Sequence, residues 1–247
     1  MSSPRLHAVK GAAFTRLSGL WLARTKITDA GLAQVAGLTD LDYLTLAKTG
    51  VTDAGLAHLK PLMKLEQLNL SDTKVTGKGL DQLKELQALV RLYLDGCPVT
   101  NDGLAHVATL TGLRSLSLNR STVSDAGLAC LAALPNLGSL MLTKTGVTDA
   151  GVAHLKSLKK LYSLNLSGTK VTGKGLDHLK KLPALALLLD GCDLTDGGLA
   201  QVAALTPLEI LSLSRTKVSD ADLARLAKQA QGDQLAEAQA QGLVGAE

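Results

Sequence analysis

The segment TKVTGKGLDQLKEL, from Thr73 to Leu86, returns almost unchanged as TKVTGKGLDHLKKL from Thr169 to Leu182. The two copies lie 96 residues apart and differ at two positions. More distant relatives of the same segment fill most of the chain. An internal repeat therefore organises the fold.

The repeat unit, written from its first leucine, is LxxLxLxxTxVTDxGLxxLxxL, and positions below are counted from that leucine. Its nine copies have a period of 24 residues, except that the eighth, Leu185 to Pro207, has 23. We expect the one-residue deletion to lie between the first and second leucines of the eighth copy, where the helix ends and the strand begins. The copies begin at Leu17, Leu41, Leu65, Leu89, Leu113, Leu137, Leu161, Leu185 and Leu208.

The two halves of each unit have different apolar periods. Leu44 and Leu46 alternate with polar neighbours, which predicts a strand, whereas Leu56, Leu59 and Leu62 recur every third residue, which predicts a short helix. Strands and helices that always alternate in the same order give a parallel sheet. A single unit cannot bury its apolar side chains, so the units must stack on one another.

Three further positions suggest how the helices begin. Position twelve is Thr or Ser in every unit, which predicts a helix N-cap. The Asp that often follows would be stabilised by the positive end of the helix dipole. Position fifteen is Gly in eight units, which indicates crowding between adjacent repeats. The ninth unit carries Asp222 there instead. Ser219-x-x-Asp222 resembles a capping box, and crowding by the following repeat would explain why only the last unit escapes it.

The two ends of the chain depart from the repeat. Residues 1–16 contain Leu6, Val9 and Phe14, spaced to cover an apolar end, and we expect an N-terminal capping segment there. Residues 17–229 hold the nine repeats. Residues 230–247 are rich in Ala, Gln and Glu, which fits either a C-terminal helical extension or a disordered tail.

The unit resembles the leucine-rich repeat, and its TDAGL element is similar to the ribonuclease-inhibitor-like and F-box-associated, cysteine-containing subtypes. The resemblance implies an α/β fold, a right-handed horseshoe solenoid with a parallel β-sheet on the concave face and short helices on the convex face. It also implies protein binding. The Thr, Ser and Cys side chains at position nine should point inward and bond to the turn backbone. No F-box precedes the repeats and no cysteine-rich caps flank them, so an adaptor role is unsupported and the extracellular receptor type is disfavoured.

Composition favours a reducing compartment and an acidic partner. Hydrophobic residues make up 46% of the chain but aromatic residues only 2%, so the core is aliphatic. A net charge of +4 favours an acidic protein partner but is too low for a dedicated nucleic-acid binder. The scattered Cys97, Cys130 and Cys192 indicate reduced thiols. With no signal-like or membrane-length apolar segment, we expect a cytoplasmic protein without membrane contact.

The sequence offers no convincing catalytic or metal site. His58, His106, His154 and His178 share one helical position, where exposed polar side chains are the simpler interpretation because further ligands are missing. Cys97 and Cys192 fit buried substitutes for threonine better than redox or metal thiols. We found no nucleophile beside a base, and Asp190 and Asp193 lack a partner base. We therefore expect no enzymatic activity, no cofactor and no metal.

The concave face offers the best candidate site. Its side chains should come from positions three, five, seven, eight and ten, and nearly all the aromatic residues outside the capping segment fall there. Large amphipathic side chains are typical interface anchors. The candidates on the strands are Trp21, Tyr43, Asn69, Arg91, Tyr93, Met141, Asn165 and Leu188. A basic stripe at positions eight and ten comprises Arg24, Lys26, Lys48, Lys74, Arg120, Lys144, Lys170, Arg215 and Lys217, against Asp72 and Asp193.

Three functions remain open at this point. The first is a protein-interaction scaffold that holds a partner against the concave face, with the basic stripe steering an acidic partner. The second is a polyanion or nucleic-acid binder, which is disfavoured because few aromatic residues are available for base stacking. The third is a structural module that associates through its ends, so the chain would be a monomer or a weak end-to-end dimer.

Overall fold

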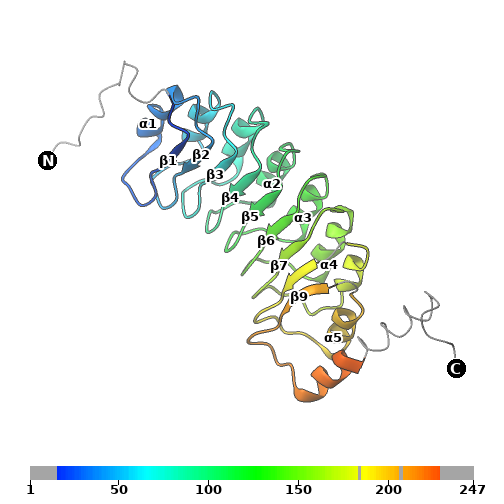
Figure 1. Cartoon of the computed structure of the whole chain (residues 1–247). Helices are drawn as coiled ribbons and strands as arrows, with labels where there is room; N and C mark the ends of the chain where they lie inside the picture. Colours follow the sequence, from blue (N-terminus) through cyan, green and yellow to red (C-terminus); the bar gives the residue numbers. More distant parts are fainter. Residues whose placement is uncertain (1–15, 183–184, 206–207, 229–247) are drawn as a thin grey trace.

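The structure is a computed structural model that describes residues 16–182, 185–205 and 208–228, and it forms an elongated solenoid (Figure 1). Nine parallel strands pair in chain order from β1 to β9, so the predicted parallel sheet is confirmed. The strands line one side of the solenoid and the helices the other (Figure 1). The predicted capping segment (apart from residue 16) and the C-terminal extension lie outside the described residues.

The strands are short and their register repeats the sequence period. Gly19 pairs with Tyr43, and Tyr43 with Gln67, one unit apart each time. A register shift falls between Leu185 and Ala186, which places the missing residue of the eighth unit where it was predicted. The strands are β1 Gly19–Trp21, β2 Tyr43–Thr45, β3 Gln67–Asn69, β4 Arg91–Tyr93, β5 Ser115–Ser117, β6 Ser139–Met141, β7 Ser163–Asn165, β8 Leu185–Leu188 and β9 Leu208–Ser212.

The helices divide between α and 3-10 geometry. A 3-10 turn has three residues, which suits apolar side chains that recur every third residue. The α-helices are α1 Asp29–Leu32, α2 Asn101–Val107, α3 Asp125–Leu131, α4 Asp149–Val152 and α5 Asp196–Ala203, and residues 220–228 are also helical. The 3-10 helices are η1 Val35–Gly37, η2 Gly55–Leu59, η3 Lys78–Leu83, η4 Ala153–Ser157 and η5 Leu176–Leu179. No described helix has both the length and the apolar character of a membrane span.

One aliphatic core runs through the stack. Leucines at positions one, four and six and valines at position eleven are buried in the central repeats, as Leu65, Leu68, Leu70 and Val75 show. Each fully buried leucine contributes about 1.5–3 kcal/mol. The last described repeat is more exposed, because no described residue from 208 to 228 is buried.

Most threonines at position nine behave as predicted, but the buried Ser121 hydroxyl has no hydrogen-bond partner among the described residues. The Thr73 hydroxyl donates to the Leu70 carbonyl at 2.6 Å, and Thr169 donates to Leu166 at the same distance. Both side chains are buried. These hydrogen bonds satisfy the carbonyl at the point where the chain leaves the strand.

Position twelve is only partly a helix cap, which corrects the prediction. The Thr148 hydroxyl accepts from Ala150 N–H at 3.2 Å, but the side chains of Thr28 and Thr100 make no capping bond. Competition for this hydroxyl is not the cause, because Thr148 also donates to Asp125 of the preceding repeat and still caps its helix. In four repeats this hydroxyl donates to the Asp at position thirteen of the preceding repeat. Such pairs are Asp29–Thr52, Asp53–Thr76, Asp125–Thr148 and Asp149–Thr172.

Position fifteen is crowded, but by the preceding repeat rather than the following one. A Cβ on Gly79 would lie 2.6 Å from the Cα and 2.7 Å from the carbonyl oxygen of Asp53. The proposed reason for Asp222 in the last unit was therefore wrong. The predicted capping box is present there, since Ser219 N–H and hydroxyl both donate to Asp222 Oδ2.

Candidate protein-binding surface

The outward strand side chains form one continuous surface, called the sheet face here: positions three, five and seven of the nine repeats. Its largest exposed group is Trp21 on β1, which remains 69% exposed. Trp21 stacks on Tyr43 of β2, with ring centroids 5.0 Å apart and an interplanar angle of 29°. The stack holds both rings in place at the first two strands of the sheet.

Position eight, next to the sheet face, has a left-handed backbone in all nine repeats, with φ between 56° and 67°. The N–H of the position-eight residue donates to the position-seven carbonyl of the next repeat, as in Lys48 to Ser71 at 2.8 Å. The bend thus extends the backbone ladder beyond the strand. Glycine suits this conformation, yet it occurs only at Gly96, Gly168 and Gly191. The other six are Arg24, Lys48, Asp72, Arg120, Lys144 and Arg215.

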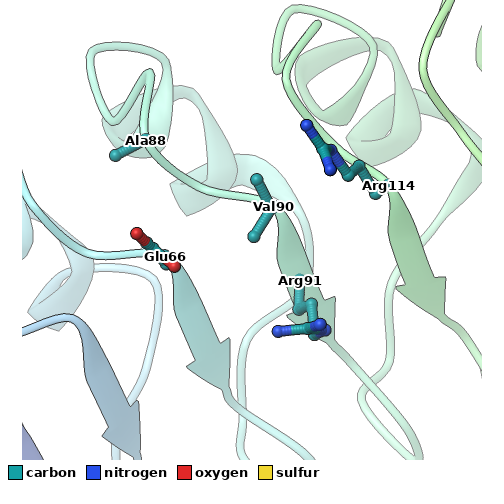
Figure 2. Close-up of a pocket in the computed structure, with 5 residues that line it drawn as sticks. All are labelled: Glu66, Ala88, Val90, Arg91 and Arg114. Carbon is teal, nitrogen blue, oxygen red and sulfur yellow. The ribbon is translucent and has the colours of Figure 1, made fainter.

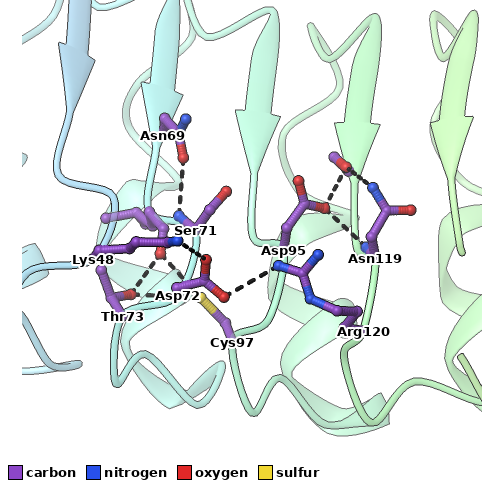
Figure 3. A network of polar contacts seen from close by, with 11 residues as sticks. Lys48, Asn69, Ser71, Asp72, Thr73, Asp95, Cys97, Asn119 and Arg120 are labelled. Atoms are coloured by element: carbon purple, nitrogen blue, oxygen red, sulfur yellow. Dashed lines mark hydrogen bonds and ion pairs between the residues drawn. The ribbon is translucent and has the colours of Figure 1, made fainter. Parts of the chain in front are cut away.

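One acidic side chain, Asp72, interrupts the cations at position eight, which are called the basic row here: Arg24, Lys48, Arg120, Lys144 and Arg215. Asp72 forms ion pairs with Lys48 at 3.8 Å and with Arg120 at 3.2 Å (Figure 3). Lys48 belongs to the preceding repeat, and Arg120 lies two repeats further on. Between them stands Gly96, where a Cβ would collide with the Asp72 carboxylate. Glycine at that position therefore leaves the space in which Asp72 and Arg120 meet.

The other strand-end aspartates tie repeats together. Asp95 Oδ1 accepts from the Ser117 hydroxyl and from Asn119 N–H at 2.9 Å (Figure 3). Asp190 repeats this arrangement with the Ser212 hydroxyl and Ser214 N–H. Their hydrogen bonds are those of structural links between neighbouring repeats, not of a catalytic pair.

A shallow hollow of about 360 Å³ lies where the strands begin, opposite the position-eight edge. Glu66, Ala88, Val90, Arg91 and Arg114 line it (Figure 2). Arg91 was predicted as a contact residue of the sheet face. The structure places it beside Arg114, which the sequence analysis did not single out.

Comparison with known proteins agrees with this architecture. The family model described as Leucine Rich repeat matches residues 62–83. An internalin C2 from Listeria monocytogenes superposes with a TM-score of 0.54 at 28% identity, covering 81% of this chain and 80% of that one. The chain is a leucine-rich-repeat protein. A second internalin of that species, InlF, has 19% identity, 85% coverage of both chains and a TM-score of 0.46. None of the curated proteins compared with the chain matches it.

The leucine-rich repeats and the internalin neighbour support a protein-interaction repeat scaffold, a class that is typically non-enzymatic. The ribonuclease-inhibitor-like and F-box-associated subtype stays a prediction. A fold alone does not specify a function, which depends on particular side chains placed on it. The sheet face and the basic stripe are therefore the places to look for a partner site.

The leucine-rich-repeat scaffold brings only some of the predicted contact residues together. Trp21 and Tyr43 touch, whereas Tyr93 lies two strands away on β4 and is half-buried. Met141 on β6 and Leu188 on β8 are also half-buried and distant from that stack. The site therefore divides into an aromatic end and a more aliphatic end.

The two asparagines predicted as contact residues form hydrogen bonds within their own turns. Asn69 Oδ1 accepts from Ser71 N–H and Asn165 Oδ1 from Ser167 N–H, both at 2.9 Å. Lysines at position ten stand at the outer edge of the stripe. All four are exposed: Lys26, Lys74, Lys170 and Lys217.

The left-handed backbone at position eight was not predicted from the sequence. The available signal was the alternation of glycine with other residues in that column, since glycine is the default residue for positive φ. It was hidden because cations fill most of the column.

The cysteines behave as buried members of the position-nine column. Cys97 Sγ donates to the Leu70 carbonyl at 3.0 Å and contacts the Thr73 hydroxyl, and Cys192 donates to Leu166 at 3.2 Å. Burial raises the pKa of the Cys97 thiol. Cys130 is half-buried on α3.

The helical histidines make weak local contacts. His106 Nδ1 lies 3.9 Å from Asp81, and His178 Nε2 lies 3.8 Å from Asp177. In the described part of the chain, no group of three or more His, Cys, Asp or Glu side chains has the arrangement of a metal site.

Proposed function

We propose that this protein is a non-enzymatic scaffold that binds a protein partner through its sheet face, with an acidic part of the partner along the basic stripe. The observation that carries the proposal is Trp21. This side chain is 69% exposed in a molecule whose other apolar side chains largely fill one core. Exposed tryptophans of this kind are enriched among the residues that dominate binding energy.

The Trp21–Tyr43 stack favours an interface for a second reason. Its rings already contact each other before any partner arrives. A preformed anchor loses less conformational freedom on binding than two independent side chains would. Arg24 follows Trp21 by three residues and presents a charge at the adjacent position-eight edge.

The basic stripe supports an acidic partner. Of its acidic members, Asp72 is paired with Lys48 and Arg120, and Asp193 is paired with Lys217 at 2.8 Å. The remaining cations keep the edge positive. Complementary charge steers association and lowers the chance of binding wrong partners.

Affinity capture from the native lysate tests the proposal. The double variant Trp21→Ala, Tyr93→Ala should lose the proteins that the wild type recovers. The matched control is Tyr162→Ala, which removes an aromatic side chain that is 58% exposed but precedes β7 instead of lying on a strand. Equal recovery by wild type and double variant would reject the sheet face as the binding surface.

A polyanion such as single-stranded nucleic acid is the second candidate, favoured only by the basic stripe. Binding that releases counterions weakens steeply as salt rises. A salt-independent affinity for oligonucleotides would exclude it. The aromatic residues here are too few to form a stacking platform of the usual kind.

We also propose a cytoplasmic location and a monomer or weak end-to-end dimer. Three free cysteines support a reducing compartment. Ile210 and Leu223, 58% and 53% exposed at the last repeat, support weak association through that end. Light scattering over a concentration series tests the oligomeric state, and fractionation of native cells tests the location.

A further inference from the structure

Repeats two to five, from Leu41, and repeats six to nine, from Leu137, are related by the same 96-residue spacing and are called the first and second halves here. The two halves differ at one residue of position eight, and that residue is charged in the first half. In the first half, Lys48, Asp72, Gly96 and Arg120 occupy position eight of four successive repeats. The equivalent residues in the second half are Lys144, Gly168, Gly191 and Arg215. Glycine has thus replaced the aspartate, while both cations and the second glycine are kept.

In the first half, Lys48 and Arg120 bind a carboxylate of the protein itself. The Asp72 carboxylate lies between Lys48 Nζ, at 3.8 Å, and Arg120 Nη2, at 3.2 Å (Figure 3). The cations are three strand steps apart, roughly 14 Å along the sheet, so a carboxylate between them lets both side chains converge. In this half, an internal carboxylate therefore occupies the space between the two cations.

The second half has the same backbone but no internal carboxylate. Gly168 and Gly191 have φ of 65° and 67°, like the residues that they replace. Lys144 Cγ would lie 3.2 Å from a Cβ on Gly168, so the lysine stem reaches over that glycine. Nothing lies within 4 Å of a Cβ on Gly191. Within the described residues, neither Lys144 nor Arg215 has an ion-pair partner.

The nearest acids of the second half are engaged elsewhere. Asp190 accepts from the Ser212 hydroxyl and from Ser214 N–H, just as Asp95 does in the first half. Asp193 pairs with Lys217 at 2.8 Å. Lys170 adds a further exposed cation at position ten. The balance of charge around the two glycines is therefore positive.

We propose that the surface over Gly168 and Gly191, between Lys144 and Arg215, binds an Asp or Glu side chain of the protein partner. The partner's carboxylate takes the place that Asp72 fills in the first half. The inference rests on the proposed function, and it names the acidic contact within it. It also assigns the two halves different roles, since the first is closed by its own aspartate and the second is open.

A fluorescein-labelled hexaglutamate peptide tests the site, with hexaglutamine as the uncharged probe and anisotropy as the readout. Gly168→Asp places in the second half the carboxylate that Asp72 supplies in the first. The left-handed turn tolerates aspartate, because Asp72 itself has φ of 56°. The variant should weaken hexaglutamate binding by up to about fivefold, the upper end of what one exposed ion pair contributes. Arg215→Gln should weaken it similarly.

Two controls separate the site from net charge. Gly37→Asp adds the same charge on the helix side, where nothing lies within 4 Å of the new Cβ, and should leave binding nearly unchanged. Asp72→Gly should open the first half and increase the amount of hexaglutamate bound at saturation. Circular dichroism and thermal unfolding verify that each variant is folded.

Unchanged affinity in folded Gly168→Asp and Arg215→Gln would overturn the proposal, and so would equal binding of hexaglutamine. An oligothymidine that binds where hexaglutamate does not would also overturn it, in favour of a nucleic-acid phosphate. Failure here is distinguishable from failure of the scaffold function. If the Trp21→Ala, Tyr93→Ala variant loses its partner while Gly168→Asp keeps it, the scaffold stands and only the carboxylate site falls.

Discussion

The carboxylate of Asp125 accepts two hydrogen bonds from Thr148, one repeat further along the chain. The backbone N–H donates at 2.8 Å and the hydroxyl at 2.6 Å. The Thr148 hydroxyl in turn accepts from Ala150 N–H at 3.2 Å. One aspartate therefore links its own helix start to the start of the next helix, and the link recurs wherever position thirteen is acidic and the next repeat supplies a threonine.

Asp125→Ala should destabilise the protein by about 2 kcal/mol, because it leaves a half-buried N–H and hydroxyl without their charged acceptor. Asp125→Asn should cost less, since Asn101 Oδ1 accepts from Ser124 N–H at 3.0 Å in the same geometry. Urea unfolding measures both. The exposed Asp102 provides the control, and an Asp102→Ala loss as large as that of Asp125→Ala would contradict the assignment.

Gly79→Ala should destabilise the stack by about 1–3 kcal/mol, the usual cost of overpacking. The new Cβ would meet backbone atoms of Asp53 at 2.6 and 2.7 Å, which cannot rotate away. Gly37→Ala is the control, because a Cβ there has no neighbour within 4 Å. Thermal unfolding should show a lower Tm for Gly79→Ala alone. Equal Tm values would disprove close stacking at position fifteen.

Native-state alkylation should label Cys130 first. Cys97 and Cys192 are 1% and 2% exposed, whereas Cys130 is half-buried. Burial also raises the pKa of Cys97, which keeps its thiol protonated and unreactive. Iodoacetamide labelling followed by mass spectrometry measures the order. Rapid labelling of Cys97 in folded protein would contradict its buried position.

The raised pKa of Cys97 also makes the free energy of unfolding depend on pH. The unfolded thiol ionises at a lower pH than the folded one, so this group's contribution is full at neutral pH and declines as pH rises above about 8.5. Cys97→Ser should flatten that decline in unfolding free energy. A wild-type curve identical to that of the variant above this pH would show that burial of the thiol has no such effect.

Acid should loosen the start of the last helix. The Ser219 hydroxyl and then its N–H lower the pKa of Asp222, with a smaller contribution from Arg225. A lowered folded pKa gives stability that is present above about pH 3.9 and lost as pH falls through the folded value. Hydrogen exchange of residues 220–228, relative to Asp222→Asn, should show a difference at pH 5 that disappears in acid. A difference that persists below about pH 2 would contradict the capping role.

Much of this molecule follows from the sequence, and particular residues show how. The leucine period predicted the parallel sheet, and the short eighth unit predicted a missing residue after Leu185, where the register shifts. Thr73 was expected to bond its own turn and does so. These features depend on contacts within one unit or on exact translation from one unit to the next, and both are visible as periodicity.

Only the tertiary structure decided the contacts that depend on how one repeat is offset against its neighbour. The offset gave Asp125 a partner in Thr148, crowded Gly79 from the preceding side, and brought Asp72 to Arg120 across 48 residues of chain. The sequence by itself determined the solenoid, its core columns and the basic stripe. Which charges in that stripe neutralise each other depends on side chains reaching across repeats, and a linear period does not contain that geometry.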